Sequence, residues 1–253
     1  MNWITTVLMV AALTAQADTL IERAGLAAES FWSRFSEVQA RERVTQARLQ
    51  ADGKVVSTRT ADFDYLAILK ARSNGVAIEE WREPRTNPSP GKAEPALVTS
   101  GFPALLLMFH PDLRGKFDFQ DSPAQSVPPG IVRIAFRSRP GQHSMSALKF
   151  NGRLYPIQWR GFAWIESATG NVTHIEASLD APMDDLGLSA LTAEVDYGPA
   201  TLGDTGTTYW LPSRATVTAR TPKQQWRDIH EFSAYRLFAV TTTTNDLTEQ
   251  KEQ

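Results

Sequence analysis

Apolar and polar residues alternate one by one along most of this chain, from Arg41 almost to its end. A period of two places alternate side chains of a β-strand in a core and the others in water. Clusters of Gly, Pro, Asn and Asp interrupt the alternation where neighbouring strands would turn. The pattern predicts a fold dominated by antiparallel strands, because short turns join antiparallel neighbours.

A single helix precedes these strands. Thr19-Leu20-Ile21-Glu22 has the pattern of a capping box, in which the Thr and Glu side chains satisfy backbone donors at a helix start. Apolar residues then recur at three- and four-residue spacing and line one helix face. These residues are Leu20, Ala24, Ala27, Phe31, Phe35 and Val38. We therefore expect a helix that begins near Thr19 and lies on the sheet.

The residues before this helix are typical of a signal peptide. Ile4 to Leu13 is apolar apart from two threonines, and Ala15-Gln16-Ala17 has the small residues that signal peptidase requires. The apolar run is shorter than the roughly 18 to 20 residues that span a bilayer, so a membrane anchor is the less favoured alternative. We expect residues 1–17 to be cleaved after Ala17 and the protein to be periplasmic or secreted, and not an integral membrane protein.

The alternating segments define the strands and a single domain over residues 18–240. The first three, Val44 to Gln50, Val55 to Leu69 and Val76 to Trp81, form a meander. Further strands are expected at Ile131 to Phe136, Phe162 to Ile165, Val172 to Leu179, Leu191 to Tyr197, Tyr209 to Ala219 and Trp226 to Val240. Pro212 predicts an edge position or a bulge. Residues 84–97 are expected to form a proline-rich loop, and residues 241–253 a disordered tail.

A second helix is predicted between Phe102 and His110, with Ser100 as its cap and Pro111 ending it. Its residues are apolar on every side, which is typical of a helix buried on several sides. His110 would place a cation at the negative end of the helix dipole. The fold class is thus α+β: a single strongly curved antiparallel sheet, an incomplete β-barrel of about nine to eleven strands, wrapped around two helices.

Composition and motifs exclude several kinds of chemistry. The 26 Lys and Arg residues against 28 Asp and Glu give a net charge of -2, so no basic surface is available for nucleic acid. The absence of Cys excludes thiolate nucleophiles and thiolate metal sites. HExxH, GxSxG and Gly-rich phosphate loops do not occur. We expect no catalytic residues, no metal and no cofactor; a hydrolase that uses His174 and Glu176 is the weakest alternative.

Four sequence segments together resemble the periplasmic lipoprotein carrier family, the outer-membrane lipoprotein sorting proteins and their relatives. They are Arg43-Val44-Thr45-Gln46-Ala47 after the first helix, Asp52-Gly53-Lys54-Val55-Val56, Phe162-Ala163-Trp164-Ile165 followed by Thr169-Gly170-Asn171, and Trp210-Leu211-Pro212. The resemblance implies an incomplete barrel wrapped around helices. The carriers have an Arg-Pro pair where this chain has Arg82-Glu83-Pro84, so their arginine-based latch is not carried over to Arg82. Relatives with this fold also act in envelope stress sensing.

Aromatic strands and the all-apolar second helix predict a site for a hydrophobic ligand. Its predicted residues are Phe102, Leu105, Leu106, Phe109, Phe63, Tyr65, Phe136 and Trp164. The function we expect is that of an exported, non-enzymatic binding protein for a lipid, a lipoprotein acyl chain or another hydrophobic ligand. The alternative is an envelope stress sensor or scaffold that binds a protein partner through an exposed sheet edge.

Overall fold

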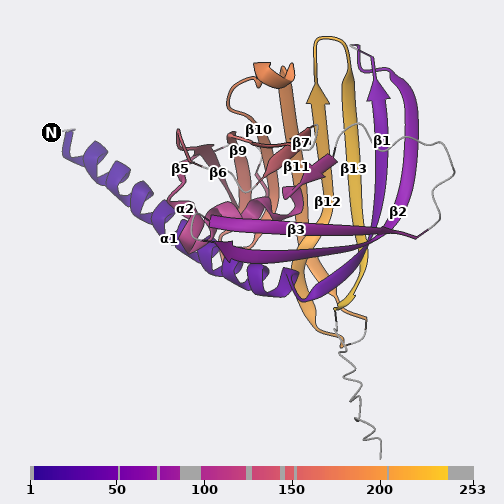
Figure 1. Cartoon of the computed structure of the whole chain (residues 1–253). Helices are drawn as coiled ribbons and strands as arrows, with labels where there is room; N and C mark the ends of the chain where they lie inside the picture. The colour runs from indigo at the N-terminus through magenta and orange to yellow at the C-terminus, as the bar shows by residue number, and fades with distance from the viewer. Residues whose placement is uncertain are drawn as a thin grey trace, which may run out of the picture.

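A bent sheet and one long helix account for most of this computed structural model (Figure 1). It describes residues 3–50, 52–72, 75–85, 98–123, 127–142, 146–150, 153–203 and 205–238. Most of the predicted 84–97 loop and the predicted 241–253 tail lie outside these residues.

The main sheet has ten strands in the order β3-β2-β1-β13-β12-β11-β10-β9-β6-β5, and every neighbouring pair is antiparallel. Its strands are β1 (Val38–Leu49), β2 (Val55–Arg72), β3 (Gly75–Pro84), β5 (Phe117–Asp121), β6 (Ile131–Ser138), β9 (Trp159–Glu166), β10 (Val172–Leu179), β11 (Ala190–Thr201), β12 (Thr208–Arg220) and β13 (Gln225–Leu237). Among the described strands, the two ends of the sheet, β3 and β5, do not pair with each other. The prediction of a curved, open antiparallel sheet is confirmed at this level.

A second, smaller sheet was not predicted. It joins β4 (Val98–Ser100), β7 (Ala147–Phe150) and β8 (Arg153–Pro156) in the order β4-β7-β8. Strands of three and four residues are too short to show an alternating pattern, which explains why the sequence does not indicate them.

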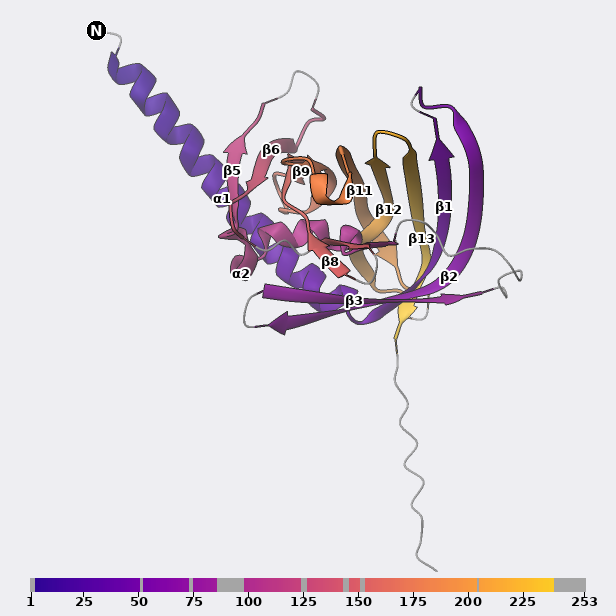
Figure 2. The ribbon, with the colours of Figure 1, turned by 45° about the horizontal axis from the view of Figure 1, so that its top comes forward.

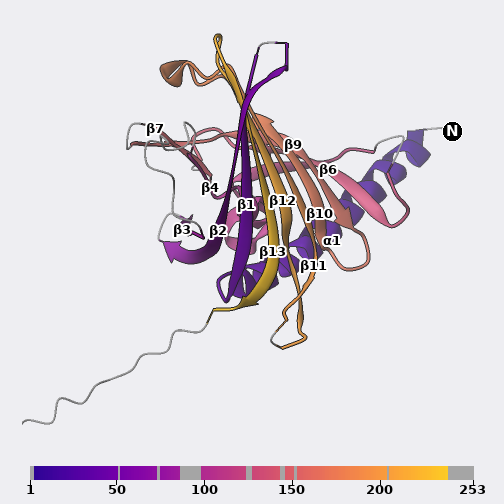
Figure 3. The same cartoon turned by 90° about the vertical axis from the view of Figure 1, so that its right-hand side faces the viewer.

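The long β2 strand bends the main sheet. Its first part pairs with β1, and its last part, from Phe63 to Arg72, pairs with β3. The β2–β3 hairpin therefore turns away from the upright strands and runs across their lower ends (Figures 1 and 2). Seen from the side, the upright strands form one layer, and α1 (Trp3–Phe35) and η1 (Phe102–Phe109) lie behind it (Figure 3).

The helix α1 is continuous from Trp3 to Phe35, so it does not begin at Thr19 as the capping box predicts. Its buried face contains Leu20, Ala24, Phe31 and Phe35 as predicted, but Ala28 is buried where Ala27 is only partly so, and Val38 is not in the helix because it begins β1. Among the described residues, no helix is both long and apolar enough to cross a membrane.

The predicted helix from Phe102 to His110 is a short 3₁₀ helix, η1, followed by the four-residue helix α2 (Pro111–Arg114). Gly101, with a φ of 78°, occupies the cap position, and Ser100 belongs to β4, so the predicted Ser100 cap is wrong. The predicted role of His110 is also wrong: its Nδ1 accepts a hydrogen bond from the Asp112 amide and caps the start of α2.

Pro212 lies at a bulge, which is one of the two positions predicted for it; the other was an edge strand. β12 is an interior strand, and its pairing with β11 shifts register between Arg214 and Pro212, which leaves Ser213 without a facing residue. The Pro212 carbonyl accepts a hydrogen bond from the Tyr235 hydroxyl at 2.6 Å. The bulge accommodates a residue that has no N–H to give to the ladder.

Candidate functional site

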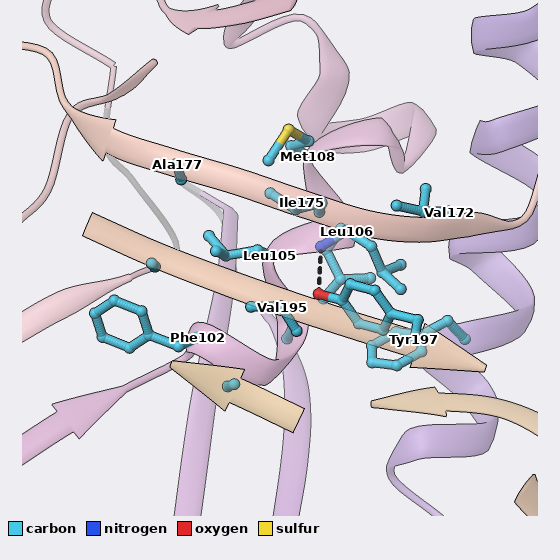
Figure 4. Packing of buried hydrophobic residues seen from close by; sticks show 14 of the residues in the cluster. Phe102, Leu105, Leu106, Met108, Val172, Ile175, Ala177, Val195 and Tyr197 are labelled. Carbon is cyan, nitrogen blue, oxygen red and sulfur yellow. Dashed lines mark hydrogen bonds between the residues drawn. The ribbon is translucent and has the colours of Figure 1, made fainter. Parts of the chain in front are cut away.

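The 3₁₀ helix η1 lies on the concave side of the main sheet, and its surroundings are the first candidate site. All eight of its residues are buried, and the seven other than Pro103 have exposed fractions between 0 and 2%. The Leu106 amide donates a hydrogen bond to the Tyr197 hydroxyl of β11 at 3.2 Å (Figure 4). In Figure 4, Leu105 and Leu106 lie close to Val172 and Ile175 of β10 and Val195 of β11. The segment therefore fills the concave side with apolar side chains.

Six of the eight predicted site residues belong to one hydrophobic core cluster. They are Phe102, Leu105, Leu106, Phe109, Tyr65 and Phe136. Phe109 stacks on Phe119 at 5.0 Å between ring centroids, and Phe117 joins Phe119 to Phe136 at 6.2 and 6.4 Å. Phe63 is on the Tyr65 side of β2 but is only partly buried. In this conformation the buried side chains contact one another, so a ligand can reach them only if some of them move.

Trp164 is not brought together with the other predicted site residues. Its neighbours Ala163 and Ile165 are fully buried, so alternation along β9 turns Trp164 to the convex face. There its ring lies 4.9 Å from that of His174, and the Arg133 guanidinium covers Phe162 at 4.4 Å. Phe-Ala-Trp-Ile is apolar on both faces of the strand, so the sequence does not show which pair faces the core.

A buried group of charged residues was missed by the sequence analysis. Glu42 of β1 is fully buried, and its carboxylate receives two hydrogen bonds from the Arg82 guanidinium of β3, at 2.7 and 3.1 Å. Its Oε1 also lies 2.8 Å from Nδ1 of His230 in β13. The only signal in the sequence is a charged residue at an inward position of a strand, and the partners lie 40 and 188 residues away.

The charges in this group stabilise one another. Burial alone would raise the pKa of the Glu42 carboxyl, but the hydrogen bonds and charges of His230 and Arg82 outweigh burial and hold that pKa below its usual value. Burial would lower the pKa of Arg82, but the Glu80 and Glu42 carboxylates outweigh it and raise that pKa. The Glu42 carboxylate and the Arg82 guanidinium are therefore both ionised at neutral pH.

The charged group extends to the start of η1 through Glu80. The Tyr65 hydroxyl donates to Glu80 Oε1 at 2.6 Å, and the Gly101 amide donates to Glu80 Oε2 at 3.2 Å. Burial and the Glu80 charge raise the pKa of Tyr65 well above its usual value, so its hydroxyl keeps the proton that it donates. Arg82 lies 3.6 Å from Glu80 and thus contacts the residue that accepts a hydrogen bond from the Gly101 amide at the start of η1.

Comparisons with known proteins do not assign the chain to a family. No family model matches it, and no curated protein matches it. Among solved structures, it is similar to a DUF1329 family protein from Desulfovibrio piger, with a TM-score of 0.40 and 8% sequence identity. That similarity covers 88% of this chain and 95% of that one. The resemblance to lipoprotein carriers stays a prediction.

His174 has carboxylate partners on the convex face. Its Nδ1 lies 2.6 Å from Asp196 Oδ1, and its Nε2 lies 3.5 Å from Glu176 Oε1. Both ring nitrogens thus face acids, which leaves neither free to activate a nucleophile in this conformation. In the described part of the chain, no group of three or more His, Asp or Glu side chains has a geometry that would hold a metal ion.

Proposed function

We propose that this protein is an exported, non-enzymatic binding protein, and that its ligand is a lipid acyl chain or a similar hydrophobic molecule. The ligand binds on the concave side of the main sheet, where it replaces part of η1. The observation that carries the proposal is η1 itself, an entirely apolar and entirely buried 3₁₀ segment.

The conformation of η1 lowers the free energy needed to displace it from the concave side. A 3₁₀ helix has poorer hydrogen-bond geometry than an α-helix, and η1 is further interrupted at Ala104, whose φ of -104° and ψ of 17° are not helical. Each methylene of an acyl chain gains about 0.8 kcal/mol on leaving water. An acyl chain can therefore take over the apolar contacts that Phe102, Leu105 and Leu106 make in the unliganded protein.

Fluorescence of N-phenyl-1-naphthylamine, a dye that brightens in apolar sites, tests the proposal. Leu106→Ala empties part of the site and should raise dye affinity severalfold. Leu49→Ala is the matched control, since Leu49 is also buried, in β1, but does not belong to the hydrophobic core cluster that contains η1. Both variants should lose about 2–5 kcal/mol of unfolding free energy, and only Leu106→Ala should change dye binding.

Native mass spectrometry of the protein purified from the periplasm gives a second test. We expect a fraction of the molecules to carry lipid-sized additional mass. A ligand-free spectrum together with no binding of the dye or of added phospholipid would contradict the proposal.

A second candidate function is a sensor or scaffold that binds a protein partner at the β3 edge of the main sheet. Trp81 of β3 is 45% exposed, and among the described strands β3 pairs with β2 alone, so its other side offers backbone groups to an incoming strand. Trp81→Asp would then abolish co-purification of one defined partner and leave dye binding unchanged. A partner that binds the variant as well as the wild type would exclude this edge.

A further inference from the structure

Trp159, the first residue of β9, contains a buried hydrogen-bond donor that has no acceptor in the part of the chain that the structure describes. Its side chain is 1% exposed and lies on the same face of β9 as Ala163 and Ile165, towards the concave side. Its backbone amide donates to Ser138 Oγ at 2.9 Å. Among the described residues, none accepts a hydrogen bond from the indole Nε1.

An unpaired indole N–H in a protein interior is unusual, because a buried donor that leaves water without gaining an acceptor destabilises the fold. Trp210 shows the ordinary arrangement, in which Nε1 donates to the Val172 carbonyl at 2.8 Å. Trp159 is more deeply buried than Trp210, which is only partly so. The lack of an acceptor among the described residues therefore destabilises the protein more at Trp159 than it would at Trp210.

The group next to the Trp159 indole is the ring of Phe102. The two rings are nearly perpendicular, at 79°, with centroids 5.8 Å apart. A phenyl face is at best a weak acceptor. Phe102 is also the first residue of η1, directly after Gly101 in its left-handed conformation. The indole ring that contains the donor thus lies against the segment that the proposed ligand replaces.

We propose that the Trp159 indole N–H donates a hydrogen bond to the carbonyl oxygen of an ester- or amide-linked acyl chain that takes the place of Phe102. This inference rests on the proposed function and narrows it to a ligand class. An alkane has no acceptor, and an ether oxygen is a weaker one than a carbonyl. The carbonyl would satisfy Trp159 only when the ligand is bound, so it adds to affinity and selects acyl esters and amides over ethers.

Competition with N-phenyl-1-naphthylamine by two matched lipids tests the inference. Dihexanoyl phosphatidylcholine has ester carbonyls, and its dihexyl ether analogue lacks them but has the same length and headgroup. We expect the wild-type protein to bind the ester about 3- to 10-fold more tightly, as one hydrogen bond allows. Trp159→Phe removes the donor and should bind both lipids with equal affinity.

Trp210→Phe is the matched control. It loses a hydrogen bond that is already made, so it should lower stability and keep the ester preference. In protein with ¹⁵N-labelled indoles, the Trp159 resonance should shift with the ester and stay in place with the ether, a measurement that does not require a variant. Equal affinity of the wild type for both lipids, or a preference that persists in Trp159→Phe, would overturn the inference alone. Failure of both lipids and the dye to bind would overturn the proposed function with it.

Discussion

Gly170 allows the hairpin between β9 and β10 to touch the backbone of α1. Its φ is +79°, and a methyl group added to it would lie 2.5 Å from the Arg23 carbonyl carbon and 2.6 Å from the Arg23 oxygen. The residue therefore meets two demands, a left-handed backbone and a close approach, and only glycine satisfies both. A single residue at this place sets how closely the sheet packs on the helix.

Gly170→Ala should therefore destabilise the protein by more than backbone strain alone. Gly53→Ala measures the strain, because Gly53 has a φ of +86° and no atom within 4 Å of an added methyl group. We expect a loss of about 1–2 kcal/mol for Gly53→Ala and at least about 2 kcal/mol more for Gly170→Ala, measured by urea unfolding. Equal losses would show that the hairpin does not press on α1.

His174 should make stability depend on pH. Partial burial would lower the pKa of its imidazole, but the hydrogen bond and charge of Asp196, with the charge of Glu176, outweigh burial and raise that pKa above 6.5. A raised folded-state pKa stabilises the protein fully below pH 6.5, and this contribution is lost as the pH rises through the folded-state value. Unfolding free energies of the wild type and of His174→Gln should thus converge above neutral pH. A difference that does not change with pH would contradict the role of the two acids.

At the scale of secondary-structure elements, η1 is the one whose sequence, conformation and burial disagree with an ordinary helix. It has no polar face, and Gly101, Pro103 and Pro111 restrict its length. Its main polar contact with the sheet is the hydrogen bond from the Leu106 amide to Tyr197. That bond should govern how readily η1 leaves the concave side.

Tyr197→Phe removes the acceptor and leaves the Leu106 amide unpaired. We expect a loss of about 1–3 kcal/mol of unfolding free energy and faster uptake of N-phenyl-1-naphthylamine in stopped-flow fluorescence. Tyr209→Phe serves as the control, because in the described part of the chain the Tyr209 hydroxyl forms hydrogen bonds with Arg34 and Glu37 and not with η1. Unchanged uptake by Tyr197→Phe would mean that η1 does not limit entry of the dye.

The sequence predicts a strand or helix well where one of its faces is buried and the other is exposed to solvent. The meander of β1, β2 and β3 and the bulge at Pro212 follow from alternation and from proline chemistry. The 3₁₀ conformation of η1 could not be predicted, because a segment in which every residue is apolar shows no periodic alternation of apolar and polar residues. The Trp164 orientation fails for the same reason, since both faces of its strand are apolar. The Glu42 group could not be found, because its members meet only once β1, β3 and β13 are placed side by side.

At the scale of the whole molecule, the fold joins regions that are far apart in sequence. Glu42 near the start of the sheet contacts Arg82 and, at a separation of 188 residues, His230. Glu42→Gln should leave these two side chains buried without their shared anion. We expect a loss of about 3–5 kcal/mol of unfolding free energy. Glu79→Gln, which removes a more exposed ion pair with Lys70, should cost within about 1 kcal/mol, and a similar cost for both would show that burial adds nothing.

The two sheets should also differ in local stability. The β4–β7–β8 sheet has strands of three or four residues, whereas interior strands such as β11 and β12 have 12 and 13. Amide hydrogen exchange should therefore be fastest in the small sheet and slowest in β11 and β12. Exchange at one common rate in both sheets would mean that they open only together.

The pairing of β1 with β13 has a consequence for the order of folding. Among the described strands of the main sheet, β13 alone connects β3, β2 and β1 on one side with β12 to β5 on the other, and it is the last of them in sequence. During synthesis, before residues 225–237 have been made, the chain can form two separate half-sheets. Each has an unpaired strand edge, β1 in one and β12 in the other, and β13 later fills the seam between them. Closure of that seam requires contacts of long sequence separation, which form slowly. A chain that stops before β13 would keep both edges open and would be prone to aggregate.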